Sequence, residues 1–384
     1  MISVLSRPFR HRYNASMIRK SSAPLILAGD IGGTNTNLAL VRYDSGSFKV
    51  LFSQRFATKE QISLIAPIER FLDVAKNSKG LENIDCCCIS GAGPVENGSI
   101  SLTNAAWSIS ARDIQDRFGF PTTLINDFTA ISYAVMLLDE NDPQKILRLP
   151  HTDGHMPNPI PGMALVVGAG TGLGVGFIDR KPDGSCHAYP SEGGHSEASS
   201  YDALSSDLIE WTRQACGYDP GIELFVSGQG IENIFTFLCS SCFNPDKASP
   251  YENATGLPSP NPEPMEESIL GLDKEALPAA VAANAKRLPR CSLAMEIFTQ
   301  FYARKVSSLA SIFLPVAGIY LAGGISSKNQ DLLLENNRFM KIFERNYAPH
   351  IRDFLCSTPV LLVRDYSISL LGAANAAVQK GGLE

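Results

Sequence analysis

Long apolar runs and clustered basic residues are both missing from this chain. No uninterrupted apolar stretch approaches the ~20 residues that a membrane-spanning helix requires. Acidic residues outnumber basic ones, 39 to 33, and the net charge of −6 disfavours a nucleic-acid partner, whose phosphates attract clustered Lys and Arg. The first absence excludes a membrane-spanning protein, and the second argues against a nucleic-acid-binding one.

A disulfide or metal framework is missing as well, although the chain has nine cysteines. Cys86, Cys87 and Cys88 stand together in an apolar segment, which is typical of small thiols in a buried strand. Cys239 and Cys242 have the spacing of half a redox or zinc site, but no second CxxC pair or histidine partner accompanies them. The pattern favours reduced, packed thiols over a metal or redox role.

Acidic residues are also missing from the chain before Asp30. Residues 1–23 instead contain serines and the basic side chains Arg7, Arg10, Arg12, Arg19 and Lys20. Such leaders resemble organellar transit peptides, whereas a disordered basic tail, or an extension upstream of a start at Met17, would have the same composition. We expect a cytoplasmic protein, with a mitochondrion or plastid as the alternative, and leave this leader out of the fold prediction.

What the chain does contain, from residue 25 onward, is an alternation of strand and helix patterns, which predicts an α/β fold. The length of 384 residues favours two or three domains. Strands are predicted at 25–29, 37–43, 48–56, 84–89, 122–125, 163–167, 175–178, 318–322 and 360–363. Helices are predicted at 62–75, 128–138, 276–285, 292–313, 330–343 and 367–380. Residues 149–162 and 244–264, rich in Pro and Gly, are predicted to be surface loops.

A hairpin with a glycine turn occurs once in each half, which indicates an internal duplication. The first turn is Gly29-Asp30-Ile31-Gly32-Gly33-Thr34. Glycines there let backbone N–H groups approach an anion, Asp30 can hold the water shell of a metal ion, and Thr34 can donate a hydroxyl. A hairpin that uses its glycines for turn geometry alone is the alternative.

The second turn, residues 168–174, has glycine at every second position and includes Gly170, Thr171 and Gly172. It is no dinucleotide fingerprint, because the glycines do not follow GxGxxG and a strand comes next instead of a helix. A Walker A Lys-Ser/Thr pair is absent too. Alternate glycines would clear one face of the hairpin for phosphate, and two such hairpins suggest a triphosphate held between two lobes.

Polar residues at strand ends and turns complete the candidate chemistry. Asn126 can cap the helix that follows its strand, but capping does not require Asp127, which is better placed to accept a hydroxyl proton. Glu192 and His195, separated by two glycines, can converge on one small polar ligand, although a surface turn has the same pattern and a metal pair lacks a third ligand. Glu223, taken alone, is typical of a solvated carboxylate.

Five motifs in one order, from about residue 25 to the C-terminus, resemble those of the bacterial-type glucokinase family, within the sugar kinase–actin–Hsp70 superfamily. They are the phosphate-1 loop at 29–34, the sugar-and-base motif at 126–128, phosphate-2 at 168–174, the hexose-binding turn at 192–195 and the adenosine motif at 321–325. Segments 103–107 and 224–230 also resemble family segments, and the second aligns Glu223 with the family's last sugar-binding carboxylate. The repressor–kinase branch matches poorly, because its CxCGxxGCxE zinc motif is absent.

The resemblance implies a two-lobed actin-like ATPase (ribonuclease H-like) fold with a ligand cleft between its lobes. A small α/β domain would comprise residues 24–137 and 365–384, and a large one residues 138–364. It implies an ATP-dependent glucokinase that acts as a homodimer, has no nucleic-acid or membrane partner, and transfers the γ-phosphoryl group of ATP to the 6-hydroxyl of glucose. A silent sugar-binding sensor, an ATPase or polyphosphate-using relative, and a kinase for another hexose are the alternatives.

The resemblance also assigns roles, with Asp127 as the base, Asp30 on the water shell of Mg²⁺, and ATP and Mg²⁺ as cofactors. The implied glucose contacts are Asn104, Asn126, Asp127, Glu192, His195 and Glu223. The implied nucleotide contacts are Gly29, Asp30, Ile31, Gly32, Gly33, Thr34, Gly170, Thr171, Gly172, Gly323 and Gly324.

Overall fold

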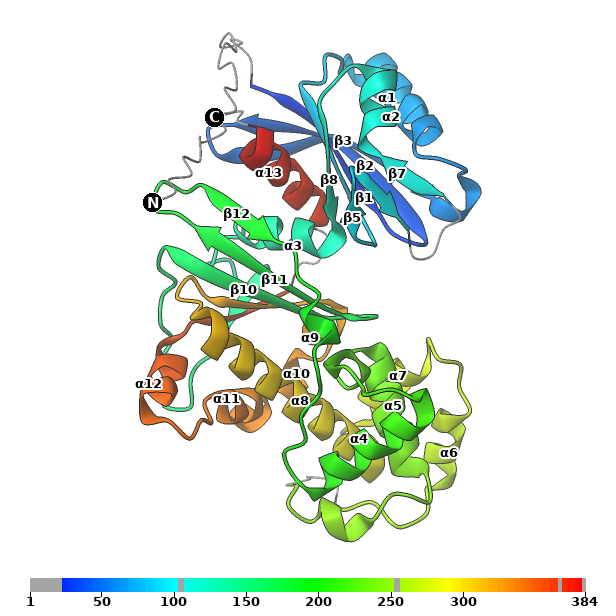
Figure 1. Ribbon diagram of the computed structural model, residues 1–384, viewed down its shortest axis with the longest axis vertical. Coiled ribbons are helices and arrows are strands. Elements are labelled where there is room, and N and C mark those ends of the chain that lie inside the picture. Colours follow the sequence, from blue (N-terminus) through cyan, green and yellow to red (C-terminus); the bar gives the residue numbers. More distant parts are fainter. Residues whose placement is uncertain (1–22, 103–106, 252–255, 365–367, 382–384) are drawn as a thin grey trace, which may run out of the picture.

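Two mixed β-sheets, one in each lobe, organise the chain (Figure 1). The structure is a computed structural model and describes residues 23–102, 107–251, 256–364 and 368–381. The upper sheet has the order β3-β2-β1-β4-β8, with strands Ser47–Ala57, Asn35–Asp44, Leu25–Ile31, Cys86–Gly91 and Thr122–Asn126. The lower sheet has the order β12-β11-β10-β13-β14-β9, with strands Cys186–Tyr189, Leu173–Arg180, Gly162–Ala169, Ile319–Ala322, Val360–Val363 and Ile146–Arg148. A small third sheet joins β5 (Val95–Glu96), β6 (Ser99–Ser101) and β7 (Ser108–Ser110).

The internal duplication expected from the two glycine hairpins is confirmed by the strand pairing. In the upper sheet β1 pairs antiparallel with β2 and parallel with β4, and in the lower sheet β10 pairs antiparallel with β11 and parallel with β13. The order β3-β2-β1-β4-β8 therefore corresponds strand for strand to β12-β11-β10-β13-β14. A helix follows the last strand of each set, α3 (Asp127–Val135) after β8 and α13 (Ser369–Gly381) after β14.

Helices α3 and α13 lie between the two sheets (Figure 1). Helix α13 packs on β1 and β4 of the upper sheet, while α3 packs on β11 and β12 of the lower one. The two helices approach closely because residue 372 is a glycine: a Cβ there would come within 1.9 Å of the Ala130 carbonyl oxygen. The Asn375 amide adds a buried hydrogen bond of 3.0 Å to the Tyr133 carbonyl.

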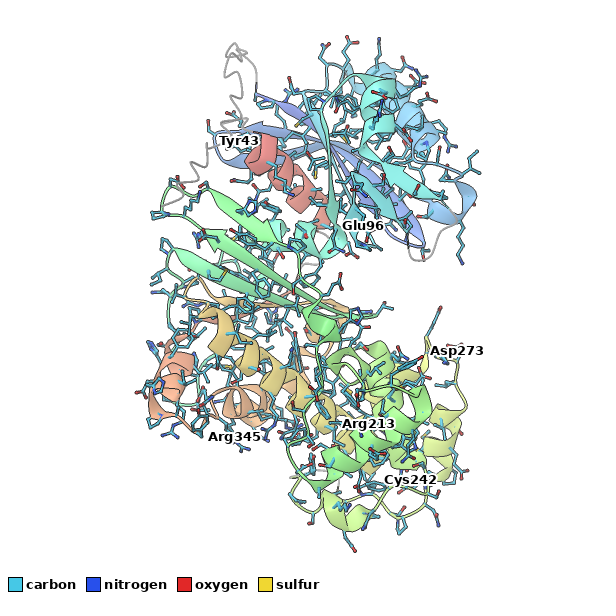
Figure 2. The ribbon with its side chains drawn as sticks, viewed as in Figure 1. Tyr43, Glu96, Arg213, Cys242, Asp273 and Arg345 are labelled. Atoms are coloured by element: carbon cyan, nitrogen blue, oxygen red, sulfur yellow. The ribbon has the colours of Figure 1, made fainter. Side chains whose placement is uncertain are left out.

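The other face of the lower sheet is covered by helices, of which α8 (Pro289–Phe313) is the longest at 25 residues (Figure 1). Helices α11 (Arg338–Phe343) and α12 (Pro349–Ser357) pack beside it. A helical group continues from α8 and includes α4 (Ala203–Cys216), α5 (Gly228–Cys239), α6 (Pro264–Leu270) and α7 (Leu277–Asn284). Arg213 and Cys242 mark this group in Figure 2. The remaining helices are α1 (Ile65–Lys79), α2 (Ala111–Phe118), α9 (Gly324–Lys328) and α10 (Gln330–Leu334).

Two sequence predictions about the lower lobe were wrong. The segment 330–343 is not one helix, because Asn336 and Asn337 adopt left-handed φ values of 55° and 54° and break it between α10 and α11. The segment 244–264 is not simply an exposed loop in its described parts, since Ala248 and Tyr251 are buried. The Arg290 guanidinium, fully buried and paired with Glu266 at 3.0 Å, also donates to the Ser259 carbonyl and anchors the segment.

The segment 149–162 is a surface loop along most of its length, but one end of it is anchored. Leu149 and His151 are buried, and His151 contacts Glu344 of the chain beyond α11. The three adjacent cysteines lie buried in β4, as predicted, and burial raises the pKa of the Cys86 and Cys88 thiols to about 12. In the part of the chain that the structure describes, no helix is long and apolar enough to cross a membrane.

Candidate active site

The parallel strands of the upper sheet end at one edge and bring the first polar residues together there. Asp30 of β1 is in register with Ser90 of β4, and Gly91 of β4 with Asn126 of β8. The carboxyl ends of parallel strands in an open α/β sheet are where ligands generally bind. The edge that carries Asp30 and Asn126 is therefore the first half of a candidate site.

Asp127 begins helix α3 at this edge, and its carboxylate is largely enclosed by protein. Its Oδ1 accepts a hydrogen bond of 2.8 Å from the backbone N–H of Phe128. Burial raises the pKa of Asp127, the Phe128 N–H opposes that shift, and the nearby negative charge of Asp30 raises the pKa further. A carboxylate has acceptor sites beyond this one bond, so Asp127 can still accept a proton from a ligand.

Asn126 does cap helix α3, as the alternative reading of its position proposed. Its Oδ1 accepts from the backbone N–H groups of Phe128 at 2.8 Å and Thr129 at 3.3 Å. Its Nδ2 donates to the Gly93 carbonyl at 3.3 Å. The residue thus fixes the start of the helix, and with it the place of Asp127, whatever contact it makes to a sugar.

The first glycine turn divides into a buried part and an open part. Gly29 and Ile31 are buried within β1, and a Cβ on Gly29 would lie 2.5 Å from the Ile89 side chain, so close strand packing accounts for this glycine. Gly32 and Gly33 are half-buried and Thr34 is exposed, which leaves these three open to a ligand.

The open part of the turn is held by Thr58, a residue that no motif indicated. The Thr58 hydroxyl donates to the Gly32 carbonyl at 2.8 Å, and its backbone N–H donates to the Thr34 carbonyl at 2.9 Å. Thr58 lies beyond the whole second and third strands, so only the folded hairpin brings it to the turn. A preorganised turn loses less conformational entropy when it binds an anion.

Asp30 is bonded to two serine hydroxyls in this structure. Ser90 donates to its Oδ1 at 3.2 Å, and Ser369, at the start of α13, donates to its Oδ2 at 2.8 Å. The described residues contain no group of three or more side chains arranged to hold a metal ion. Mg²⁺ in kinase sites is commonly held by one or two carboxylates together with waters and substrate phosphates, and Asp30 with neighbouring Asp127 fits that limited role.

Away from its tip, the alternate glycines of the second hairpin serve a different purpose from the one predicted. A Cβ on Gly174 would come within 2.2 Å of the Phe128 ring, one on Gly168 within 2.5 Å of it, and one on Gly176 within 2.4 Å of the Ser132 hydroxyl. These glycines make room for helix α3 and not for phosphate. Their packing brings Phe128, and with it Asp127, against the second hairpin.

The tip of the second hairpin remains open and is tied to Glu223. The Gly170 N–H donates to the Gly172 carbonyl at 2.9 Å, and the Gly228 N–H donates to the Gly170 carbonyl at 2.8 Å. The Leu173 N–H donates to Oε2 of Glu223 at 2.7 Å, so this carboxylate is not a solvated one. A Cβ on Gly172 would lie 2.6 Å from the same oxygen, so a larger residue there would displace the Glu223 carboxylate.

The Gly323-Gly324 turn lies beside this tip, because β13 runs parallel to β10 and pairs Ala322 with Gly168. Gly323 has a φ of +94°, and a Cβ there would lie 2.3 Å from the Ala169 carbonyl oxygen, so only glycine fits. Gly324 begins α9 with open space around it. The predicted phosphate-2 and adenosine segments therefore share one edge of the lower sheet.

Glu192 and His195 face each other across their two glycines. Glu192 Oε2 and His195 Nε2 are 3.6 Å apart, and the two side chains are 75% and 66% exposed. The turn packs on the start of β11, where a Cβ on Gly194 would lie 2.0 Å from the Leu173 carbonyl oxygen. Since Leu173 also bonds Glu223, the three predicted sugar ligands lie on adjoining turns.

Lys305 of α8 supports this turn from below, and sequence reasoning missed it. Its Nζ donates to the Ser196 hydroxyl at 2.5 Å, and that hydroxyl donates to the Gly193 carbonyl at 2.7 Å. Burial lowers the pKa of Lys305. A lysine within a long amphipathic helix carries no local signal of such a contact. Asn104, the remaining predicted sugar ligand, lies outside the described residues.

Comparison with known proteins agrees with this geometry. A family profile described as Glucokinase matches residues 27–380. A glucokinase of Nostoc sp. is 30% identical over 365 residues, covering 92% of this chain and 99% of the relative.

Two solved structures share the fold. A glucokinase from an Antarctic psychrotroph has a TM-score of 0.73 at 25% identity, covering 92% of this chain and 98% of the other. A ROK family glucokinase from Streptomyces griseus, in complex with glucose and AMPPNP, has a TM-score of 0.55 at 19% identity, with coverage of 92% and 99%. The two-lobed fold is the actin-like fold of these sugar kinases, as predicted. The chain belongs to the glucokinase family.

Proposed function

We propose that this protein is an ATP-dependent glucokinase, which transfers the γ-phosphoryl group of ATP to the 6-hydroxyl of glucose and releases glucose 6-phosphate and ADP. The observation that carries the proposal is the position of Asp127. Its enclosed carboxylate starts α3 at the edge of the upper sheet, and the next residue packs against the glycines of the second hairpin. Asp127 is thus close to Asp30 of the first turn, and its neighbour Phe128 packs on the second hairpin.

Asp127 would orient the 6-hydroxyl and accept its proton on the carboxylate as the new O–P bond forms and the bond to the ADP oxygen breaks. Phosphoryl transfer of this kind passes through a loose transition state, so positioning matters more than early deprotonation of the nucleophile. The raised pKa of Asp127 brings the base nearer to the operating pH, which favours general base catalysis.

The phosphates of ATP would lie between the open parts of the two turns, Gly32, Gly33 and Thr34 on one side and residues 170–172 on the other. Gly323 and Gly324 would contact the adenosine of ATP. Asp30 would contact Mg²⁺ through water, and the ion would neutralise charge on the phosphate oxygens. The AMPPNP and glucose named for the Streptomyces griseus relative support this choice of ligands.

Asn126, Glu192, His195, Glu223 and the undescribed Asn104 would bind the hydroxyl groups of the sugar. Such a site rejects sugars that lack a hydroxyl, because its polar groups would be left unpaired. We expect Glu192→Gln to raise KM for glucose about tenfold, the equivalent of one charge-assisted hydrogen bond, and to leave KM for ATP unchanged. Steady-state kinetics with each substrate varied checks this, and equal changes in both KM values would argue against a sugar contact.

Lys305→Met is expected to raise KM for glucose several-fold without changing KM for ATP, because it frees the Ser196 hydroxyl that fixes the sugar turn. The methionine keeps the buried stem of the side chain and removes only its ammonium group. Lys305→Arg, which retains a donor, serves as the control and should fall between the two. A Met variant with wild-type KM for glucose would remove Lys305 from the positioning of this turn.

The alternatives to glucose kinase activity differ in what they consume. A silent sensor would bind sugar without turnover, and a kinase for another hexose would prefer that epimer. An ATPase would need no sugar, and a polyphosphate-using relative would need no ATP. A coupled assay that crosses several hexoses with ATP, ADP and polyphosphate tests the proposal. We expect the highest kcat/KM for glucose with ATP, and a clear preference for another pair would overturn it.

The division into domains, the oligomeric state and the location of the protein are proposals of the same kind. We place residues 24–137 and 365–384 in a small domain and residues 138–364 in a large one, supported by the packing of α13 on β1 and β4. A homodimer and a cytoplasmic location agree with the family resemblance. Sequencing the N-terminus of the mature protein distinguishes this location from import into a mitochondrion or plastid.

A further inference from the structure

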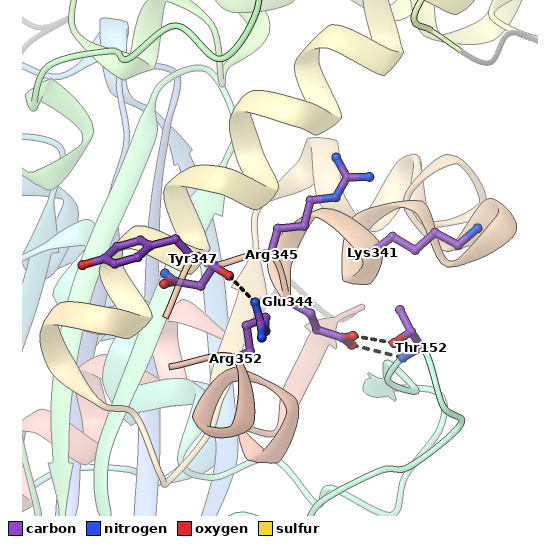
Figure 3. A pocket seen from close by; sticks show the side chains of 7 residues that line it. Thr152, Lys341, Glu344, Arg345, Tyr347 and Arg352 are labelled. Carbon is purple, nitrogen blue, oxygen red and sulfur yellow. Dashed lines mark hydrogen bonds between the residues drawn. The ribbon is translucent and has the colours of Figure 1, made fainter. Parts of the chain in front are cut away.

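A hollow of about 580 Å³ lies on the lower lobe, among α11, α12 and the anchored loop (Figure 3), and no residue of the candidate active site lines it. Its wall includes Lys341, Glu344 and Arg345 from the end of α11 and just beyond, Asn346, Arg352 from α12, and Thr152. Arg345 marks the position of the hollow on the lower lobe in Figure 2. Nothing in the proposed phosphoryl transfer uses these residues.

The hollow has three cationic side chains and one carboxylate, Glu344, which is already engaged. Glu344 Oε1 lies 2.9 Å from His151 Nδ1 and accepts from the Thr152 N–H at 3.1 Å, while Oε2 accepts from the Thr152 hydroxyl at 2.5 Å. His151 Nε2 lies 3.0 Å from the Thr358 carbonyl oxygen. His151 and Thr152 together therefore engage both carboxylate oxygens of Glu344.

The three cations outnumber the one carboxylate in the hollow. Among the described residues, neither the Lys341 ammonium nor the Arg345 guanidinium has a hydrogen bond or an ion pair, and Arg352 Nη1 donates only to the Asn346 carbonyl, at 3.1 Å. Figure 3 shows Glu344 turned toward Thr152, while the charged ends of Lys341 and Arg345 point away from it and from each other. The charge of Arg345 also contributes, after burial, to the lowered pKa of Arg304 on α8. All three cationic side chains are exposed, so their charged ends are free to turn toward an anion in the hollow.

The frame around the cations is fixed by hydrogen bonds. The Asn346 side chain accepts a hydrogen bond of 3.0 Å from the N–H of Ala348, just before Pro349 begins α12. The backbone carbonyl of Asn346 accepts a hydrogen bond from Arg352. On the opposite side of the hollow, Glu344 is fixed by its contacts to His151 and Thr152. The frame is therefore preorganised, and binding a ligand would restrict mainly the side chains of Lys341 and Arg345.

We propose that this hollow binds a phosphate group carried by a small molecule. Guanidinium forks match the oxygens of phosphate, and an ammonium adds a compact charge. The volume falls within the ~300–1,000 Å³ typical of small-molecule pockets, which leaves room for more than a bare ion. Inorganic phosphate and a phosphate monoester present the same group, and the experiment separates them.

Calorimetric titration of the full chain with inorganic phosphate and, separately, with glucose 6-phosphate tests the proposal at low and high salt. The variant is Lys341→Gln with Arg345→Gln and Arg352→Gln. Its matched control, Arg42→Gln with Lys49→Gln and Lys79→Gln, removes three exposed cations elsewhere and changes the net charge equally. Glucose kinase turnover in both should equal that of the wild type, since neither touches the candidate active site.

We expect at least one phosphate compound to bind the wild type more weakly at high salt, and the hollow variant to lose about tenfold or more in affinity while the control keeps it. Binding of the ester alone would identify a phosphorylated metabolite, and equal binding of both compounds a general phosphate site. If glucose 6-phosphate binds the hollow variant as tightly as it binds the wild type, it occupies the active site as a product. If neither compound binds the hollow variant more weakly than the wild type, the proposal is overturned. Failure of both compounds to bind the wild type would overturn it as well, without bearing on the kinase proposal.

Discussion

Asp127→Asn is expected to lower kcat by about 10²- to 10⁴-fold, the usual contribution of a general base, with little change in KM for glucose. Asparagine keeps the Oδ1 acceptor for the Phe128 N–H, so the start of α3 stays in place, but its amide cannot take up the hydroxyl proton. Initial-rate kinetics under saturating ATP measures the effect. Asp139→Asn, which removes an exposed carboxylate beyond α3, is the control and should keep wild-type turnover.

The same variant should be at least as stable as the wild type, because the pKa of Asp127 is raised in the folded protein. The folded state then retains a proton that the unfolded chain has released, so stability falls as pH rises from the ordinary aspartate pKa through the raised one. Above that window the charged carboxylate is a cost that asparagine removes. A variant that melts well below the wild type at neutral pH would contradict this account of the site.

The activity of the wild type should also depend on the ionisation of Asp127, but it should rise with pH where the stability falls. The base must be ionised to accept a proton, so kcat should fall as pH decreases through the raised pKa of Asp127, which lies above that of an ordinary aspartate. A pH–rate profile measures this, provided that stability is followed in parallel.

Gly174→Ala is expected to destabilise the protein by about 1–3 kcal/mol, the usual cost of overpacking, and to reduce turnover as well. The new Cβ would lie 2.2 Å from the Phe128 ring, and the ring can move only by displacing the start of α3, where Asp127 lies. Denaturant unfolding measures the free energy of unfolding, and initial rates measure the turnover.

Two further variants separate this collision from a general effect of alanine in the hairpin. Gly170→Ala at the tip meets nothing closer than 4.0 Å and should leave the free energy of unfolding nearly unchanged. Phe128→Leu, combined with Gly174→Ala, should recover part of the lost stability, since the smaller side chain vacates the space. If Gly170→Ala and Gly174→Ala were equally destabilising, the glycines would not serve the packing of α3.

Much of the sheet framework could be predicted from the sequence, because apolar segments bounded by glycine turns report strands locally. The helical group was predicted less well. Helix α4 has a capping box between Asp202 and Ser205 and apolar residues at helical spacing, so its signal was present and was not used. The break at Asn336 and Asn337 was harder to predict, since the apolar pattern runs through it and only two left-handed residues reveal it.

The candidate site, too, could be predicted from the sequence only in part. The turns and polar residues were found because they are local in sequence, and the family resemblance assigned their roles. Contacts between distant segments were not found: Phe128 against the glycines of β10 and β11, Thr58 on the first turn, and Lys305 on Ser196. Alternate glycines indicate that something approaches one face of a hairpin, but their spacing does not tell a phenyl ring from a phosphate.

The measurement that tests the central claim most directly is ATP consumption by the purified full chain with and without glucose, with both products quantified. The account predicts that glucose 6-phosphate and ADP form in equal amounts, that ATP is consumed far more slowly when glucose is absent, and that Asp127→Asn loses the glucose-dependent part. ATP consumption at the same rate with and without glucose, or glucose-dependent turnover that survives in Asp127→Asn, would contradict it.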